Sequence, residues 1–311
     1  MRAVLHHDAG PAVLALLERH RTDWLDLGWT PVRDRRHLGV ALADADVLLH
    51  VLDPVDDAML ARAPRLRLVQ KVGVGVNTID LDAARARGIA VANMPGVNTV
   101  AAAEHALALL LAVLRRLPAY DAATRAGDGW AVDPSLGETC GEIAGRTVGL
   151  VGYGAIARRF ERALLALDAR VLHTSRTPDG PDWRPLDELV AGCDVVSLHV
   201  PLTDETRGLL TAERLGRMRA GAILVNTARG GLVDQPALVD ALRSGVLGGA
   251  GLDVFADEPT APGEPLLALD NVVLTPHVAW LTVETVARGL VVAVENCRRL
   301  HAGEDLVHRI V

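Results

Sequence analysis

The chain has few of the residues that mark metal-binding, secreted or membrane-spanning proteins. Its 311 residues include only three cysteines, Cys140, Cys193 and Cys297. Their odd number and irregular spacing match neither a metal site nor a disulfide framework, which favours a reducing compartment. The longest apolar run, at 106–114, is far too short to cross a bilayer. No secretory pattern opens the chain, so we expect a soluble, cytoplasmic protein without a metal.

Lysine is almost absent, because Lys71 is the only one and arginine carries nearly all of the positive charge. The formal net charge is −7, and the arginine-rich pieces at 33–36 and 298–299 are short. A nucleic-acid-binding domain would instead concentrate basic residues on one surface. We therefore expect no nucleic-acid partner. Lys71 ends a predicted strand, where a lysine more often points to solvent than meets an anionic substrate.

Strand-like and helical segments alternate along the first part of the chain. Half of the residues are hydrophobic, which is enough for two cores in a chain of two-domain length. Short β-rich runs lie at 3–5, 46–51, 66–72 and 89–91, and helix candidates lie at 11–20, 56–61 and 81–87. A long helix is predicted at 99–116, and a polar loop at 127–145. Because this helix is apolar over most of its surface, we expect it to be buried.

A second series of the same kind fills the rest of the chain. We predict strands at 147–151, 170–174, 195–198, 222–226, 249–252 and 272–274, and a final helix at 283–300. Strands that alternate with helices in this way predict parallel sheets with helices on both faces.

A glycine turn at the start of the second series carries a dinucleotide fingerprint. The strand at 147–151 runs into Gly152 and Gly154, and an apolar-periodic helix follows at 156–167. Gly152 permits a tight turn, and Gly154 lets backbone amides approach a pyrophosphate at the helix N-terminus. Ala157 replaces the third glycine and still permits close helix–strand packing. A glycine turn alone is often structural, but this strand–turn–helix context predicts nucleotide binding.

The acidic residue that binds the ribose hydroxyl in NAD sites, about 20 positions after the glycines, is missing here. Ser175 stands at that place, and Arg176 follows it. A carboxylate would repel a 2′-phosphate, whereas serine and arginine side chains bind one. The pattern favours NADP over NAD. The alternative is a loop arginine beside a site that still accepts NAD.

Three chemically capable side chains follow strands of the second series, where ligands of open α/β sheets collect. Arg229 comes after the strand at 222–226 and can hold a carboxylate through two parallel hydrogen bonds. His277 comes after the strand at 272–274 and can exchange a proton with a carbonyl oxygen. Glu258, which lies between them, would favour a protonated imidazole and fix its tautomer. Each residue alone would more often be structural, but together they indicate catalysis.

An ordered set of motifs, spread over nearly the whole chain, resembles the D-isomer-specific 2-hydroxyacid dehydrogenases. These motifs are GVGVNTID at 73–80, AAEHA at 102–106, GYGAIA at 152–157, HVPLT at 199–203, NTARGGLVD at 226–234, DVF with EP at 253–259, and TPH at 275–277. The resemblance implies an oxidoreductase that passes a hydride between NAD(P)H and a small 2-oxo acid or D-2-hydroxy acid.

The resemblance also implies roles for individual residues. Arg229 would bind the substrate carboxylate and polarise the keto oxygen, while His277 would be the acid/base with Glu258 as its partner. The backbone amides of Val74 and Gly75 would also hold the carboxylate. Cofactor contacts are implied at Gly152, Gly154, Ala155, Ile156, Ser175, Arg176, Val200, Pro201, Thr206, Thr227, Ala228 and Asp253. Among these, Asp253 would face the nicotinamide carboxamide.

The implied fold is a Rossmann-type cofactor domain inserted in a flavodoxin-like substrate domain, each a doubly wound parallel sheet. The substrate domain would comprise residues 1–97 plus 280–311, and the dinucleotide-binding domain residues 98–279. Family members are usually homodimers, with the long helix near 99–116 at their interface.

Two other functions remain open. One is a nucleotide-sensing interaction protein, such as a corepressor that reuses this fold, although it would not need Arg229, Glu258 and His277. The other is a reductase of larger branched or aromatic 2-oxo acids. Trp280 either walls the substrate pocket or packs between domains, and its resemblance to glycerate and hydroxypyruvate enzymes favours a small hydroxylated substrate. Formate is disfavoured, because formate dehydrogenases of this fold carry an amide in place of Glu258.

Overall fold

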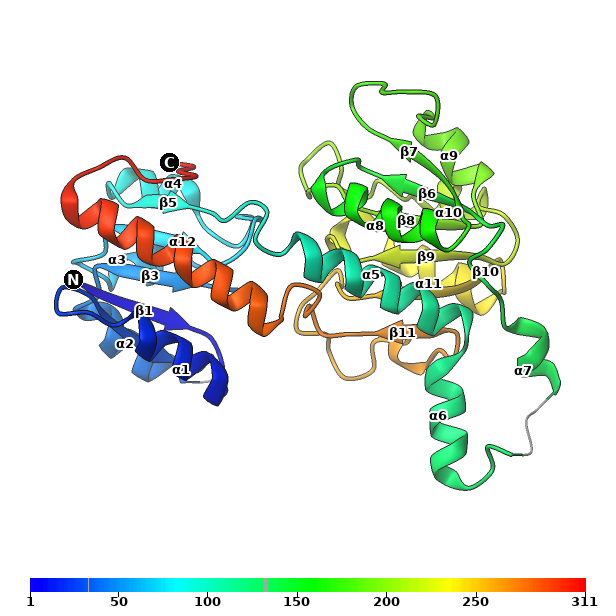
Figure 1. The fold of residues 1–311 in the computed structure, drawn as a ribbon, viewed down its shortest axis with the longest axis horizontal. Helices are drawn as coiled ribbons and strands as arrows, with labels where there is room; N and C mark the ends of the chain where they lie inside the picture. The colour runs from blue at the N-terminus through cyan, green and yellow to red at the C-terminus, as the bar shows by residue number, and fades with distance from the viewer. Residues whose placement is uncertain (33, 131–133) are drawn as a thin grey trace. The chain divides into compact units, whose positions relative to one another are not determined.

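The computed structural model describes residues 1–32, 34–130 and 134–311 and divides them into two α/β units (Figure 1). A terminal unit comprises Met1–Asn98 and Leu281–Val311, and a central unit comprises Thr99–Trp280. Both boundaries lie one residue later than those expected from the sequence. Each unit holds one parallel sheet flanked by helices, which confirms the predicted fold class of two doubly wound α/β domains.

The terminal unit is built on a five-stranded sheet with the order β2-β1-β3-β4-β5, which is the flavodoxin-like order. Its strands are β1 (Arg2–His6), β2 (Asp26–Thr30), β3 (Val47–His50), β4 (Leu68–Lys71) and β5 (Ala90–Ala92). Every residue of β3 and β4 is buried, as expected for central strands covered on both faces. Strand β2 was not predicted, because the run DLGWT is an edge strand without continuous apolar character.

Short polar side chains cap the start of each helix of the terminal unit except α1, which follows Gly10. These helices are α1 (Pro11–His20), α2 (Arg35–Ala43), α3 (Asp57–Ala61), α4 (Leu81–Ala86) and α12 (Val283–Ala302). The carboxylates of Asp56 and Asp80 accept hydrogen bonds from amides in the first turns of α3 and α4, both at 2.8 Å. The C-terminal helix α12 packs against α1, so both ends of the chain build this unit.

The central unit is built on a six-stranded parallel sheet with the order β11-β10-β9-β8-β6-β7. Its strands are β6 (Thr147–Val151), β7 (Arg170–Thr174), β8 (Val195–Leu198), β9 (Ala222–Asn226), β10 (Leu247–Leu252) and β11 (Val272–Leu274). A Rossmann sheet has a further strand outside β7. Here Trp183 makes an isolated parallel bridge to His173, with backbone hydrogen bonds of 3.0 and 2.9 Å. That strand is thus reduced to one residue, and counting it gives the Rossmann order with β11 as an additional edge strand.

Helices cover both faces of the central sheet. They are α5 (Thr99–Leu114), α6 (Leu117–Ala126), α7 (Pro134–Thr139), α8 (Ala155–Ala166), α9 (Leu186–Gly192), α10 (Ala212–Gly216) and α11 (Gln235–Arg243), with the 3-10 turns Gly230–Leu232 and Pro265–Ala268. The prediction of a loop throughout 127–145 is wrong, because α7 lies within it. Its sequence PSLGET is short and contains Pro and Gly, so it carries no helical periodicity.

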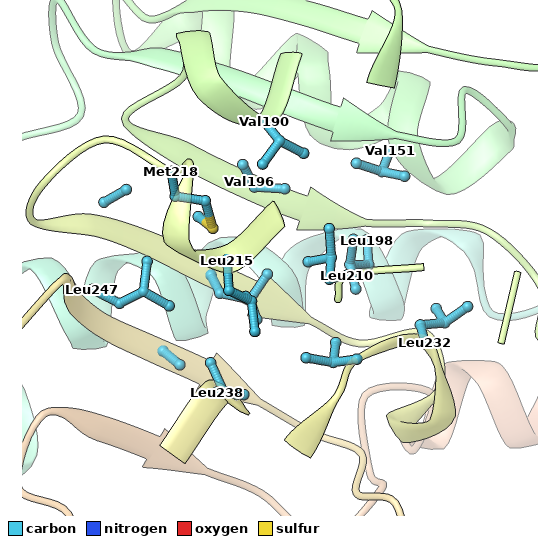
Figure 2. Close-up of a cluster of buried hydrophobic side chains, with 14 of the residues drawn as sticks. Val151, Val190, Val196, Leu198, Leu210, Leu215, Met218, Leu232, Leu238 and Leu247 are labelled. Atoms are coloured by element: carbon cyan, nitrogen blue, oxygen red, sulfur yellow. The ribbon is translucent and has the colours of Figure 1, made fainter. Parts of the chain in front are cut away.

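Two apolar clusters hold these layers together. On one face, buried Val and Leu side chains from the sheet pack against side chains of α9, α10 and α11 and against Met218, as Figure 2 shows. On the other face, α5 and α8 pack closely on the sheet. A Cβ at Gly251 would come within 2.8 Å of the Leu109 side chain, so this glycine allows α5 to approach β10. In the described part of the chain, no helix has the length and apolarity needed to cross a membrane.

Candidate active site

The carboxyl ends of all six central strands meet at one edge of the sheet, because the strands run parallel. The predicted cofactor residues follow these ends: Gly152, Gly154, Ala155 and Ile156 after β6, Ser175 and Arg176 after β7, Val200 and Pro201 after β8, Thr227 and Ala228 after β9, and Asp253 after β10. Thr206 is the one predicted cofactor residue that does not directly follow a strand end. Its hydroxyl donates to the Pro201 carbonyl at 2.7 Å and so closes the turn after β8.

The glycine turn after β6 has the geometry that a pyrophosphate requires. Gly152 has φ +93°, and a Cβ there would lie 2.7 Å from the His199 carbonyl oxygen. Gly154 caps α8 without a side-chain hydrogen bond, and a Cβ there would meet no atom within 4 Å. Ala157 is fully buried between helix and sheet. The start of α8 therefore has no side-chain cap, and the space beside Gly154 is open.

An arginine–aromatic stack, which no sequence pattern predicted, lies beside this turn. The Tyr153 ring stacks on His173 with centroids 3.7 Å apart, and the Arg158 guanidinium lies 4.2 Å from the Tyr153 ring centroid. Arg158 also reaches the Asp179 carboxylate at 3.5 Å, in the loop after β7. In the same loop Arg176 is exposed.

His277 and Glu258 form a hydrogen-bonded pair. Nδ1 of His277 lies 2.6 Å from Oε2 of Glu258, and their side chains are 17% and 33% exposed. The other oxygen, Oε1, accepts the Phe255 amide at 2.9 Å. Since a carboxylate only accepts, Nδ1 carries the proton of this bond, and Nε2 remains for a ligand.

Electrostatics in the pair keeps Glu258 ionised. Burial on its own would raise the pKa of Glu258, but the hydrogen bond and charge of His277, the Phe255 amide and the charge of Arg229 outweigh it and lower that pKa. The pair is thus suited to hold and release a proton.

Arg229 is a half-buried guanidinium at the end of β9. Burial lowers the pKa of Arg229, and the negative charge of Glu258 partly opposes that effect. Its backbone turn is held by Asn226, whose side chain donates to the Arg229 carbonyl at 2.9 Å and accepts the Ala228 amide at 3.0 Å. At Gly230 a Cβ would lie 1.9 Å from the Phe255 carbonyl, so this glycine brings the arginine turn against the Glu258 segment.

The remaining predicted substrate residues, Val74 and Gly75, lie in the terminal unit, in the loop after β4. Val74 is 43% exposed, and its carbonyl accepts a hydrogen bond from the Asn93 side chain at 2.9 Å. Lys71 ends β4 just before this loop. It is only 5% exposed and donates to the Val51 carbonyl, so the prediction that it points to solvent is wrong.

Several residues of this edge were not identified from the sequence. Thr275 and His105 lie in the TPH and AAEHA motifs, but no chemistry was assigned to either residue. Asn226 likewise begins the NTARGGLVD motif. Thr275 and Asn226 lie close in the chain to His277 and Arg229, but closeness in the chain does not show a hydrogen bond. His105 has no predicted catalytic residue near it in the chain.

Comparisons with known proteins agree with this geometry. Residues 107–279 match the family model described as "D-isomer specific 2-hydroxyacid dehydrogenase, NAD binding domain". The chain is 43% identical over 272 residues to a glyoxylate reductase of Korarchaeum cryptofilum, covering 84% of this chain and 81% of that protein. It is 42% identical over 290 residues to a D-3-phosphoglycerate dehydrogenase of Mycobacterium tuberculosis, covering 91% of this chain and 54% of that protein.

The phosphoglycerate dehydrogenases that the chain matches are thus about twice as long as the matched region. Among solved structures, the TT0316 protein of Thermus thermophilus superposes with a TM-score of 0.88 at 42% identity, over the full length of both chains.

Proposed function

The chain belongs to the family of D-isomer specific 2-hydroxyacid dehydrogenases, and on that premise we propose that it reduces a small 2-oxo acid to the D-2-hydroxy acid with NAD(P)H, or catalyses the reverse oxidation. The observation that supports this most is the 2.6 Å pair of His277 and Glu258 beside the charge of Arg229. These groups hold a proton, its counter-charge and a carboxylate-binding cation at the edge that carries the dinucleotide turn.

Each side chain has one part in the proposed reaction. Arg229 binds the substrate carboxylate through parallel hydrogen bonds and polarises the keto oxygen. His277 gives that oxygen a proton from Nε2, while Glu258 holds Nδ1 and stabilises the charged ring. For the terminal unit by itself, we propose that the backbone amides of Val74 and Gly75 are substrate-binding groups. The bound nicotinamide supplies the hydride.

The test is turnover of glyoxylate and hydroxypyruvate, followed by the loss of reduced nicotinamide. We expect turnover with the wild type and a large loss of kcat in His277→Gln, without a matching loss of cofactor affinity. Equal losses of turnover and cofactor affinity would contradict the acid/base role. A panel that includes branched and aromatic 2-oxo acids decides between small and larger substrates.

NADP is the cofactor that we propose over NAD. Ser175 and Arg176 replace the acidic residue that binds the ribose hydroxyl, and Arg176 is exposed. The Ser175 hydroxyl donates to the Thr177 carbonyl at 2.6 Å, which orders the loop that would meet a 2′-phosphate. Comparing kcat/KM with NADPH and NADH tests this assignment, and a strong preference for NADH would refute it.

We further propose a cytoplasmic homodimer with the long helix near 99–116 at its interface, as the resemblance implies, and with α6, which follows that helix in the chain, also covered by the second copy. In this unit α6 has no buried residue and extends away from the sheet, and Leu117 at its start is 53% exposed. The free thiols of Cys140, Cys193 and Cys297 are consistent with a reducing compartment. Sedimentation of the wild type measures the assembly state.

In the proposed function the terminal unit is the substrate domain and the central unit is the cofactor domain.

A further inference from the structure

His277 has a backbone conformation that few side-chain-bearing residues adopt. Its φ is +55°, in the left-handed region. Such a residue persists only where the surrounding structure holds it. Two backbone contacts hold His277 directly, since its amide donates to the Asp253 carbonyl at 2.7 Å and its carbonyl accepts the Trp280 indole at 3.1 Å.

The Asp253 carboxylate fixes the segment on both sides of His277. Oδ1 accepts the Thr275 hydroxyl at 2.6 Å and the Val278 amide at 2.9 Å, and Oδ2 accepts the Ala279 amide at 2.8 Å. The side chain has no exposed surface. A fully buried carboxylate needs such bonds, so the segment and Asp253 stabilise each other.

The hydroxyl of Thr275 extends this network to α5. Because Thr275 donates its proton to Asp253, its oxygen is the acceptor for Nε2 of His105, at 2.9 Å. Nε2 of His105 also lies 3.6 Å from Oδ1 of Asp253. Since α5 packs on β10 and β11, His105 joins the helix to both strands that carry this network.

We propose that His105, Thr275 and Asp253 are positioning residues, which hold the 275–279 segment so that the His277 ring keeps its alignment with Glu258. This role differs from the nicotinamide contact that the family resemblance implies for Asp253, because the carboxylate is buried and already accepts three hydrogen bonds. The kinetic part of the proposal rests on the proposed function, whereas the structural part does not.

The test compares Thr275→Val, which keeps the shape but loses the hydroxyl, with Thr275→Ser, which keeps the hydroxyl. In Thr275→Val we expect kcat to fall by roughly 10- to 100-fold, the cost of a small misplacement of a catalytic group, with NADPH affinity unchanged. Thr275→Ser should restore most of the turnover. Amide hydrogen exchange of the 275–280 segment should become faster in Thr275→Val only.

Thr211→Val is the matched control. It removes the N-cap hydroxyl of α10, which accepts the Arg214 amide at 3.3 Å, and so lowers stability without touching the 275–279 segment. An equal loss of turnover in this variant would show that Thr275 acts through general stability, which would overturn the proposal. Wild-type kcat and exchange in Thr275→Val would also overturn it.

The exchange measurement separates this proposal from the proposed function. If the wild type turns over no 2-oxo acid but exchange of 275–280 rises in Thr275→Val, the function is wrong and the positioning network stands. If Thr275→Val does not fold, His105→Gln and His105→Ala take its place. The glutamine amide can still donate to Thr275, so His105→Gln should keep both the turnover and the slow hydrogen exchange of the wild type. His105→Ala should lose both. Identical behaviour of the two variants would refute the network.

Discussion

Replacing Arg229 with glutamine should separate activity from stability. The guanidinium lies half-buried, and its burial lowers the pKa of Arg229, which means that the folded state disfavours this charge. A substrate carboxylate would compensate the charge through two hydrogen bonds, each worth about 1.5–3 kcal/mol when a charged group takes part. Losing both costs about 3–6 kcal/mol, or roughly 10²- to 10⁴-fold in kcat/KM.

The free energy of unfolding should respond in a different way. Arg229→Gln loses the hydrogen bond from Nη1 to the Ala228 carbonyl, but it also removes a charge that burial penalises. We therefore expect the unfolding free energy to fall by less than about 1 kcal/mol, or to rise. The pKa of Glu258 should increase, because the positive charge of Arg229 is one of its lowering causes.

The assays are steady-state kinetics with glyoxylate and thermal unfolding with and without oxamate, an unreactive 2-oxo acid mimic, in the presence of NADPH. Oxamate should raise the melting temperature of the wild type and leave that of Arg229→Gln unchanged. Arg229→Lys, which keeps the charge but loses the paired geometry, should have intermediate activity. A kcat/KM within tenfold of the wild type, or an oxamate shift that survives in Arg229→Gln, would refute the role of this residue.

Three further predictions concern other parts of the molecule. Burial, then the charge of Lys71, lowers the pKa of His50 to about 3, and burial lowers that of His199 to about 4, from 6.5. Only the unfolded chain then binds these protons, so the unfolding free energy should fall below pH 6.5, by about 2 kcal/mol per histidine near pH 5 in a urea titration series. Gly152→Ala should lower the melting temperature and abolish dinucleotide binding, because its Cβ would lie 2.7 Å from a carbonyl oxygen at φ +93°; unchanged binding by calorimetry would argue against the turn. Ser175→Asp should lower kcat/KM for NADPH by at least tenfold and spare NADH, through repulsion of a 2′-phosphate; equal changes with both cofactors would place the 2′-phosphate elsewhere.

Local signals predicted most of the central sheet. Strands β6, β7, β8 and β9 have the bounds expected from the sequence, because buried parallel strands are short apolar runs between polar or glycine turns. The edge strand β2 and the short helix α7 lack such patterns, so neither was found. The single-residue bridge at Trp183 has no sequence pattern at all, because one residue has no periodicity.

The pairing of His277 with Glu258 was predicted from their positions after neighbouring strands and from the family resemblance, and the structure confirms that the two side chains are hydrogen-bonded. The buried position of Lys71 was not predicted, because burial depends on which strands cover β4 rather than on the lysine itself.

By itself the sequence determined most elements of this protein, the glycine turn and the kinds of side chain that follow each strand, since these depend on residues close together in the chain. Only the tertiary structure decided how those side chains are bonded. Thr275 meets a histidine 170 residues away and an aspartate 22 residues away, and it can do so because α5 packs across the ends of β10 and β11. Hydrogen bonds require atoms within about 3 Å of each other, and no pattern along a chain specifies distances of that size between distant segments.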